Sequence, residues 1–211
     1  MAVLGEGSGL RLASALAELT IDAADALVTA ELLAAGRPLR FVHPLVRTAV
    51  YEQLPSGVRF QAHTRAAHLL ASEGAEPEQI AGQLLAGEPA GDPDAVRALR
   101  VAAAAALARG APETAVTYLR RALAEPPTES VRAAVLGELG GAERIARDPA
   151  AVVHLEQAWQ ATTDPVARAR LASQLANVLL FTANWVRSFA VLQAGLDDLG
   201  DRDPDLAGVS W

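Results

Sequence analysis

Residues 115–123 read Ala115-Val116-Thr117-Tyr118-Leu119-Arg120-Arg121-Ala122-Leu123. The stretch recurs as Ala151-Val152-Val153-His154-Leu155-Glu156-Gln157-Ala158-Trp159 and, more loosely, as Ser188-Phe189-Ala190-Val191-Leu192-Gln193-Ala194-Gly195-Leu196. In each copy the apolar residues recur every three or four positions, which is the spacing of one buried helix face. The central leucines, Leu119, Leu155 and Leu192, lie 36 and 37 residues apart. This period predicts a repeated helical unit.

The period is close to the 34 residues of a tetratricopeptide repeat, in which each unit is a helix pair. Small residues such as Ala115, Ala122 and Ala151 allow paired helices to approach closely, and the leucines fill the layer between them. Three pairs are about the minimum that buries a continuous core. We therefore expect an all-α protein whose residues 87–211 form a tetratricopeptide-like, right-handed solenoid. The expected pairs are 92–109 with 112–124, 128–147 with 149–161, and 164–182 with 184–199.

The first part of the chain, residues 1–86, has a different pattern of elements. Helix, helix, strand and helix within about 45 residues predict a winged-helix-like module. A linker rich in Pro and Gly, residues 87–93, separates this module from the repeats. The expected elements are helices over 10–19, 22–33, 44–54, 56–72 and 78–85, with minor β structure at most, in a short strand over 39–42.

The composition excludes several classes of function. The formal net charge of −7 argues against direct binding of nucleic acid, which would need a basic face. The chain has no Cys and no Lys, and this rules out thiol chemistry and a phosphate-binding loop of the G-x-x-x-x-G-K-[ST] type. The first residues do not resemble a signal peptide, and the longest uncharged apolar run, 171–186, is too short to cross a bilayer. We expect a cytoplasmic protein without membrane contact.

One constellation has the form of a site. His43 and Arg47 lie four residues apart at the start of the helix expected over 44–54, so both can point the same way. Unpaired N–H groups and the helix dipole make that turn favourable for an anion. Alternatively, His43 caps the helix and Arg47 is solvated or paired with a carboxylate. Residue chemistry leaves both interpretations open.

The other candidates have simpler explanations. We expect His63 and His68 to be solvated, because five residues of separation put them about 140° apart on a helix. His154 occupies the Tyr118 position of the repeat and is expected to be partly buried. Trp159, Trp185 and Phe189 form an aromatic stripe, which we interpret as core, with a ligand groove as the alternative. The run Gly5-Glu6-Gly7-Ser8-Gly9 is interpreted as a turn and not as a nucleotide loop. No pattern predicts catalytic residues or metal ligands.

Three stretches resemble one family in order. They are residues 36–55, with the string Phe41-Val42-His43-Pro44-Leu45-Val46-Arg47-Thr48-Ala49-Val50-Tyr51, residues 66–71 and residues 108–123. They are similar to the middle part of actinobacterial LuxR-type transcriptional regulators with an N-terminal signal-transducing, STAND or AAA-like ATPase module. In that family a winged-helix region and a helical-repeat sensor follow the ATPase core, and a DNA-binding helix-turn-helix closes the chain.

The resemblance implies that His43 takes part in nucleotide binding only together with an ATPase core. In related ATPases a winged-helix histidine contacts the nucleotide phosphates, and His43 matches it, with Arg47 as a looser companion. The P-loop, its acidic metal partner and the helix-turn-helix are missing from this sequence, so the chain resembles an internal fragment that binds no cofactor alone, although ATP or ADP would bind the full-length family.

We therefore expect a non-enzymatic regulatory segment. Its partners would be the ATPase core and the DNA-binding domain, or a peptide, protein or small effector on the concave repeat face. The alternative is a free-standing repeat adaptor that binds proteins, and an enzyme with an unrecognised acid–base site is a third, weaker hypothesis.

Overall fold

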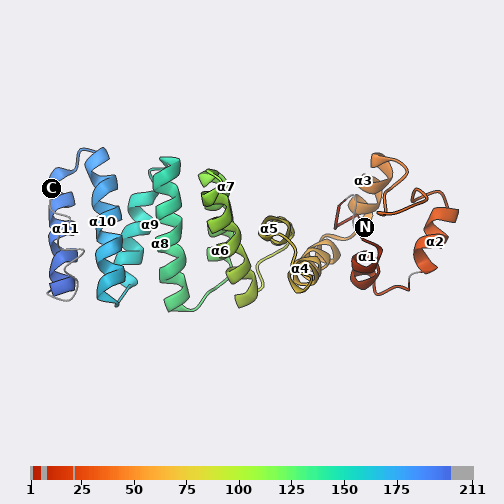
Figure 1. Ribbon diagram of the computed structural model, residues 1–211, viewed down its shortest axis with the longest axis horizontal. Coiled ribbons are helices and arrows are strands. Elements are labelled where there is room, and N and C mark those ends of the chain that lie inside the picture. The colour runs from red at the N-terminus through yellow and green to blue at the C-terminus, as the bar shows by residue number, and fades with distance from the viewer. Residues whose placement is uncertain (1, 6–8, 21, 201–211) are drawn as a thin grey trace. The chain divides into compact units, whose positions relative to one another are not determined.

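The computed structural model describes residues 2–5, 9–20 and 22–200 of the chain. Across these residues it contains eleven α-helices and no sheet, so the expected all-α class is confirmed. The chain divides into two compact units, Met1–Pro89 and Ala90–Trp211, which we call unit 1 and unit 2 (Figure 1). None of the helices in the described part combines the length and the apolar character needed to cross a membrane.

Unit 1 is a group of short helices around small apolar clusters. Helix α4 packs against both α1 and α5. A separate cluster joins Ala13 of α1 to Leu33 and Leu39 of the segment between α2 and α3. The five helices are α1 (Leu10–Ala17), α2 (Asp22–Thr29), α3 (Pro44–Gln53), α4 (Ser56–Ser72) and α5 (Pro77–Ala86).

The strand expected over residues 39–42 is reduced to one antiparallel bridge, between Leu33 and Phe41. Two backbone hydrogen bonds flank it: the N–H of Ala34 donates to Arg40, and the N–H of Val42 donates to Leu32. A pairing this short is too small to form a stable ladder, since even an isolated two-stranded hairpin is marginal. The winged-helix assignment of unit 1 therefore stays a prediction.

Unit 2 consists of three helix pairs (Figure 1). The three pairs expected between residues 92 and 199 are present, with helix ends within about two residues of the expected ones. Asp92 and Asp164 cap the first helices of two pairs, accepting the N–H groups of Asp94 and Ala167, and a proline follows each cap. The pairs are α6 (Pro93–Ala108) with α7 (Pro112–Ala124), α8 (Glu129–Ala146) with α9 (Ala151–Ala161), and α10 (Pro165–Phe181) with α11 (Trp185–Leu199).

The core of unit 2 follows the repeat. Each helix packs on the next along the chain, and α8 also contacts α10. The small position at the start of each second helix is fully buried in all three repeats. Each helix from α6 to α10 contributes one fully buried leucine: Leu99, Leu119, Leu139, Leu155 and Leu175. Close packing of these layers explains the period that is visible in the sequence.

Glu125 joins the linker to the first helix pair. Its carboxylate is buried, and Oε2 accepts the backbone N–H groups of Ala90, Gly91 and Asp92 at 2.8, 2.6 and 3.2 Å. Arg121 donates to Oε1 at 2.7 Å. Burial raises the pKa of Glu125, but the hydrogen bonds from Arg121 and the three backbone groups outweigh it, so the net pKa lies below its usual value. These hydrogen bonds therefore favour the ionised form of the Glu125 carboxylate in the folded protein.

Candidate functional site

Unit 2 contains an open groove of about 1050 Å³ along the first helices of the three pairs. We call it the repeat groove. Its volume lies at the upper end of the range of small-molecule pockets, and it is not enclosed. Half-exposed apolar side chains, Val101 on α6 and Ile145 on α8, lie along it. Its other lining residues include Arg97, Arg100, Ala104, Gly137, Glu138, Gly141, Arg144, Arg170 and Gln174.

Two glycines of α8 keep the groove floor open and bring α10 close. A Cβ on Gly137 would lie 3.0 Å from Cδ2 of Leu171. A Cβ on Gly141 would lie 3.1 Å from Oε1 of Gln174. Helix α8 is continuous from Glu129 to Ala146 despite these glycines. Gly137 allows close packing against Leu171, whereas the atom near Gly141 is the end of a flexible side chain.

The groove carries more positive than negative charge, although the whole chain is acidic. Arg100 donates through Nε to Glu138 Oε2 at 2.9 Å, in a two-pronged bridge between α6 and α8. The hydrogen bond to Glu138 raises the pKa of Arg100 against the opposing effect of burial. Arg97 pairs with Asp94 on its own helix. The exposed Arg144 and Arg170, in contrast, form no ion pair with any carboxylate of the residues that the structure describes.

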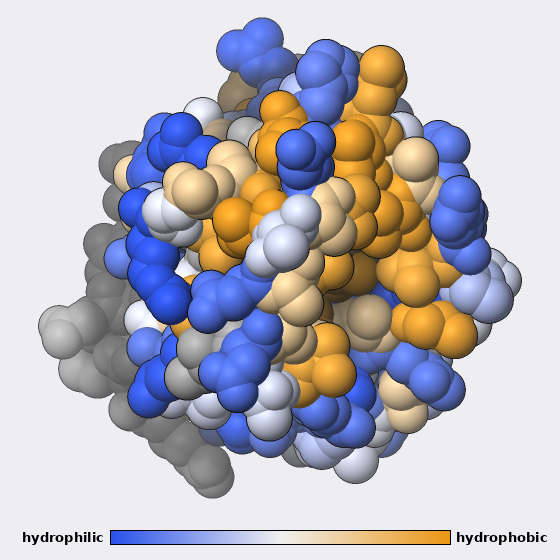
Figure 2. All heavy atoms as spheres, turned by 90° about the vertical axis from the view of Figure 1, so that its right-hand side faces the viewer, coloured by the Kyte–Doolittle hydropathy of each residue, from blue (hydrophilic) through white to orange (hydrophobic). Residues whose placement is uncertain are grey.

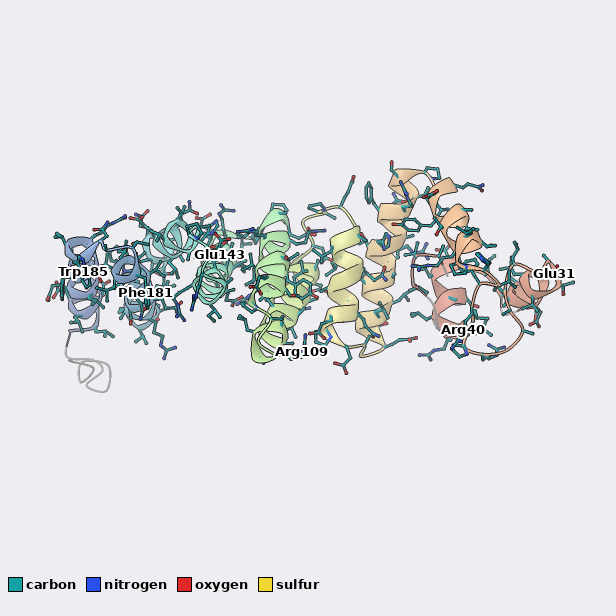
Figure 3. All side chains as sticks on the ribbon, turned by 90° about the horizontal axis from the view of Figure 1, so that it is seen from above. Glu31, Arg40, Arg109, Glu143, Phe181 and Trp185 are labelled. Atoms are coloured by element: carbon teal, nitrogen blue, oxygen red, sulfur yellow. The ribbon has the colours of Figure 1, made fainter. Side chains whose placement is uncertain are left out.

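A buried carboxylate next to Arg144 has a structural task. Glu143 is fully buried and pairs with Nδ1 of His154 at 2.6 Å and with Arg120 at 2.9 Å (Figure 3). Arg120 also reaches Asp148 at 2.7 Å, and its pKa is raised first by the hydrogen bond to Glu143. This network ties α7, α8 and α9 together. His154 is partly buried as expected. Its partner Glu143 could not be predicted from the residues, because a glutamate near a helix end is ordinarily solvated.

The structure places His43 at the N-cap of α3. Its Nδ1 accepts the N–H of Leu45 at 3.2 Å, and its backbone carbonyl accepts the N–H of Val46 at 3.0 Å. Arg47 turns to the backbone and donates from Nε to the carbonyl of Ala2 at 3.4 Å. Two first-turn donors are thus already paired within the protein. The geometry has the capping form that residue chemistry allowed, and the contact of His43 with a nucleotide phosphate stays a prediction.

His63 is not solvated, and the sequence-based expectation for it is wrong. It is buried in α4, where Nε2 lies 2.9 Å from the hydroxyl of Tyr51 and Nδ1 lies 2.7 Å from Oε1 of Gln83. The amide of Gln83 continues to the carbonyl of Val3. Because α4 is contacted from two sides, by α1 and α5, its polar-looking face is covered. His68, on the opposite side of the helix, is exposed as expected.

The aromatic stripe is mostly not core. Trp159 is partly buried, with the guanidinium of Arg168 stacked 5.2 Å from the ring centroid. Trp185 and Phe189 are instead 58% and 51% exposed on α11. None of the three lines the repeat groove. Helical spacing placed Trp185 and Phe189 on one face of α11, but it could not show that α10 packs against a different face of this helix and leaves these two residues exposed.

Unit 1 has an apolar hollow of its own, of about 330 Å³. Its walls are entirely apolar and include Leu27, Leu32, Val50 and Val58, which are partly exposed. Figure 2 faces this end of the chain and shows hydrophobic side chains gathered around a depression. A surface patch of this kind is typical of a contact with another protein.

The remaining candidates add no chemistry. Across the described residues, no group of three or more His, Asp or Glu side chains is placed to hold a metal ion. The turn expected over Gly5 to Gly9 lies partly outside the described residues, at 6–8. Comparison of the sequence with protein-family models and with curated proteins found no match.

Proposed function

We propose that this chain is a non-catalytic regulatory segment whose repeat groove binds an acidic, extended peptide segment of an effector protein. The observation that carries the proposal is the groove itself, with Arg144 and Arg170 exposed in it and not engaged by described carboxylates. The string from Phe41 to Tyr51 supports placing the segment in an ATP-dependent LuxR-type transcriptional regulator.

The shape of the groove favours an extended chain. It is open along three helices and lined by small and apolar residues at its floor, so a peptide could lie along it with side chains on Val101 and Ile145. Recognition by repeats commonly uses such elongated concave surfaces. A small-molecule effector would have less of its surface covered in this open groove than in a typical enclosed pocket.

The charge of the groove selects the ligand class. Four arginines line it against two carboxylates, Glu138 and Asp164. Glu138 is occupied by Arg100, and Asp164 caps α10. Arginine binds carboxylates in a planar, two-pronged geometry, and complementary charge speeds encounter as well as fixing orientation. An acidic peptide with intervening leucines matches both the charge and the apolar floor.

A charge-reversal experiment tests the groove. The probe is a fluorescein-labelled ten-residue peptide of alternating Glu and Leu, titrated with the full chain by fluorescence anisotropy. We expect binding that weakens as salt rises, and about tenfold or more weaker binding for the variant Arg144→Glu with Arg170→Glu.

Arg132→Glu with Arg147→Glu provides the matched control, since both arginines are exposed, on α8 and at its C-cap, and neither lines the groove. Equal loss in the control and in the double variant would mean that overall charge, and not the groove, governs binding. A peptide that fails to bind at 100 μM or so would remove the proposed ligand class.

For unit 1 we propose the ATPase core of the parent regulator as partner. The apolar patch around Leu27 and Val50 supports this, as does the exposed Leu45 beside His43. A neighbouring upstream reading frame with a P-loop, and a downstream one with a helix-turn-helix, would favour the regulator over the free-standing adaptor.

A further inference from the structure

Helices α8 and α10 run in the same direction along the repeat groove. Gly137 of α8 lies against Leu171 of α10, and Gly141 lies against Gln174. Because both contacts advance together along the two helices, α8 and α10 are parallel. The N-terminal part of α10 therefore forms one end of this stretch of the groove, and the C-terminal part of α8 lies toward the other end.

Two exposed arginines follow one another along this stretch. Arg170 directly precedes Leu171 and is level with the middle of α8, whereas Arg144 lies roughly 10 Å further along, near the end of α8. Among the residues that the structure describes, no carboxylate pairs with either guanidinium group. The exposed Ile145 is the neighbour of Arg144. From the N-terminal end of α10, the groove thus presents one cation and then a second cation with an apolar side chain.

The end of α11 lies beside the same end of the groove. Asp198, in the last turn of α11, accepts a hydrogen bond from Nε of Arg168 at 2.7 Å. Nη1 of Arg168 donates to the carbonyl of Thr162 at 3.1 Å, and Thr162 lines the groove. Since Gly200 follows Asp198 by two positions, the chain leaves α11 next to the groove lining.

Residues 201–211, which come next in the sequence, have the composition that the groove favours. Three aspartates and one arginine come first, and apolar residues follow: Leu206, Val209 and Trp211. This order, acidic before apolar, is the order in which the groove presents Arg170 and then Arg144 with Ile145. Eleven residues can extend over about 36 Å, which exceeds the roughly 20 Å from the start of α10 to the level of Arg144.

We infer that residues 201–211 are an intramolecular ligand of the repeat groove, with their aspartates at Arg170 and Arg144 and their apolar residues at Ile145. The inference rests on the groove proposed above as a peptide site, and it adds regulation: an effector peptide has to displace a segment that the chain itself carries. A tethered segment acts at an effective concentration in the mM range, so a contact with a Kd of about 0.1 mM is enough to keep the groove filled most of the time.

Neutralising the segment tests this regulation. The probe is the fluorescein-labelled peptide of alternating Glu and Leu, titrated by fluorescence anisotropy with the full chain and with the triple variant Asp201→Asn, Asp203→Asn and Asp205→Asn. We expect the variant to bind the probe about threefold or more tightly, because its own segment no longer competes well for the arginines.

A second triple variant, Glu31→Gln with Glu52→Gln and Glu113→Gln, is the matched control. It changes the net charge equally, at exposed positions that do not line the groove. Equal tightening in both triple variants would assign the effect to net charge and overturn the inference. Equal binding by the full chain and the Asn variant would overturn it too, but would leave the groove proposal standing. A probe that binds neither at about 100 μM would remove the groove proposal, and cross-linking then decides on the segment.

Cross-linking locates the segment without any probe. Because the chain has no Cys, Ala207→Cys with Ala134→Cys creates a single pair of thiols, and Ala134 is exposed in the groove. In the control pair, Val153→Cys, at an exposed position of α9 outside the groove, replaces Ala134→Cys. Disulfide formation under mild oxidation is followed by mass spectrometry.

We expect the groove pair to form its disulfide about tenfold or more faster than the control pair. Arg144→Glu with Arg170→Glu, or about 0.5 M NaCl, should remove most of this difference, because the contact is between charges. Equal rates in the two pairs would overturn the inference, and so would a rate in the groove pair that the reversed arginines leave unchanged.

Discussion

Two glycines within helices allow the paired helices of unit 2 to approach each other closely. A Cβ on Gly140 would lie 2.5 Å from Cγ of Leu155 and 3.0 Å from its backbone nitrogen. Because one of these contacts is with the backbone of α9, Leu155 cannot make room for a methyl group unless the helix itself moves. Gly195 is similar, since a Cβ there would lie 2.7 Å from that of Ala172. Close approach, and not turn formation, explains these two helical glycines.

Gly140→Ala should therefore destabilise unit 2. The new methyl group forces α8 and α9 apart, and overpacking of this kind costs about 1–3 kcal/mol, more than the helix propensity that alanine gains. Urea unfolding followed by tryptophan fluorescence measures the loss, because all three tryptophans lie after residue 90.

Gly141→Ala is the matched control for this change. The atom met there, Oε1 of Gln174, is the end of a flexible side chain that can move away. The free energy of unfolding should change by less than about 1 kcal/mol in either direction. Equal destabilisation by both alanines would contradict the packing explanation.

Single residues also show why parts of the site escaped prediction. Arg144 and Arg170 belong to no motif, and they line the same groove only because α8 and α10 are in contact. His63 and Glu143 have polar neighbours in sequence, and only the arrangement of helices buries them. His43, in contrast, was identifiable because its task is local: the proline after it and the helix it begins are adjacent in the chain.

At the scale of elements, the repeat period predicted all six helices of unit 2. The prediction needed only a small residue at three equivalent positions, Ala115, Ala151 and Ser188, and a leucine four positions after each. These local signals suffice because each helix contacts mainly its neighbours along the chain. Unit 1 was harder to predict, since some of its contacting elements, such as α1 and α4, are separated by many residues along the chain. The segment at 39–42 has strand-like residues, yet its only described pairing partner is the short segment around Leu33.

The hydrogen bonds of Glu125 to the linker backbone and to Arg121 lead to a prediction about the pH dependence of stability. Its pKa is lowered in the folded state, so its stabilisation is fully present above the unfolded-state pKa, about 4.3, and is lost as the pH falls through the folded-state value. Glu125→Gln should cost about 1–3 kcal/mol at pH 7, because a neutral amide replaces a carboxylate that accepts four donors.

The difference between wild type and variant should shrink when unfolding in urea is repeated at successively lower pH below about 4. Glu113→Gln, an exposed change at the start of the same helix, should alter stability by less than about 0.5 kcal/mol throughout. A difference that stays constant with pH would mean that Glu125 acts by packing and not by charge.

At the scale of the whole molecule, the two units suggest different tasks. Unit 1 exposes apolar residues around a hollow, and unit 2 exposes a groove lined by arginines. Neither contains the phosphate-binding lysine that tight nucleotide binding by a P-loop requires. The capping of α3 by His43 uses one ring nitrogen for the fold itself.

The full chain should consequently bind neither ADP nor ATP with micromolar affinity. Titration calorimetry at a protein concentration of about 100 μM would detect such binding. His43→Ala should not change the nucleotide titration, although it should weaken the start of α3 by about 1 kcal/mol. Micromolar binding that disappears in His43→Ala would show that the site works without its expected ATPase partner.

The chemistry of the groove lining has a consequence for how binding responds to conditions. Its cations are all guanidinium groups, and no histidine or lysine lines it. Guanidinium stays protonated at every pH where proteins function. The positive charge of the groove is thus constant across that range. Above about pH 6, where ordinary carboxyl groups are ionised, a change of ligand affinity with pH would report a titrating group on the ligand, such as a phosphate or a histidine, and so a simple pH titration would describe the chemistry of an effector before its identity is known.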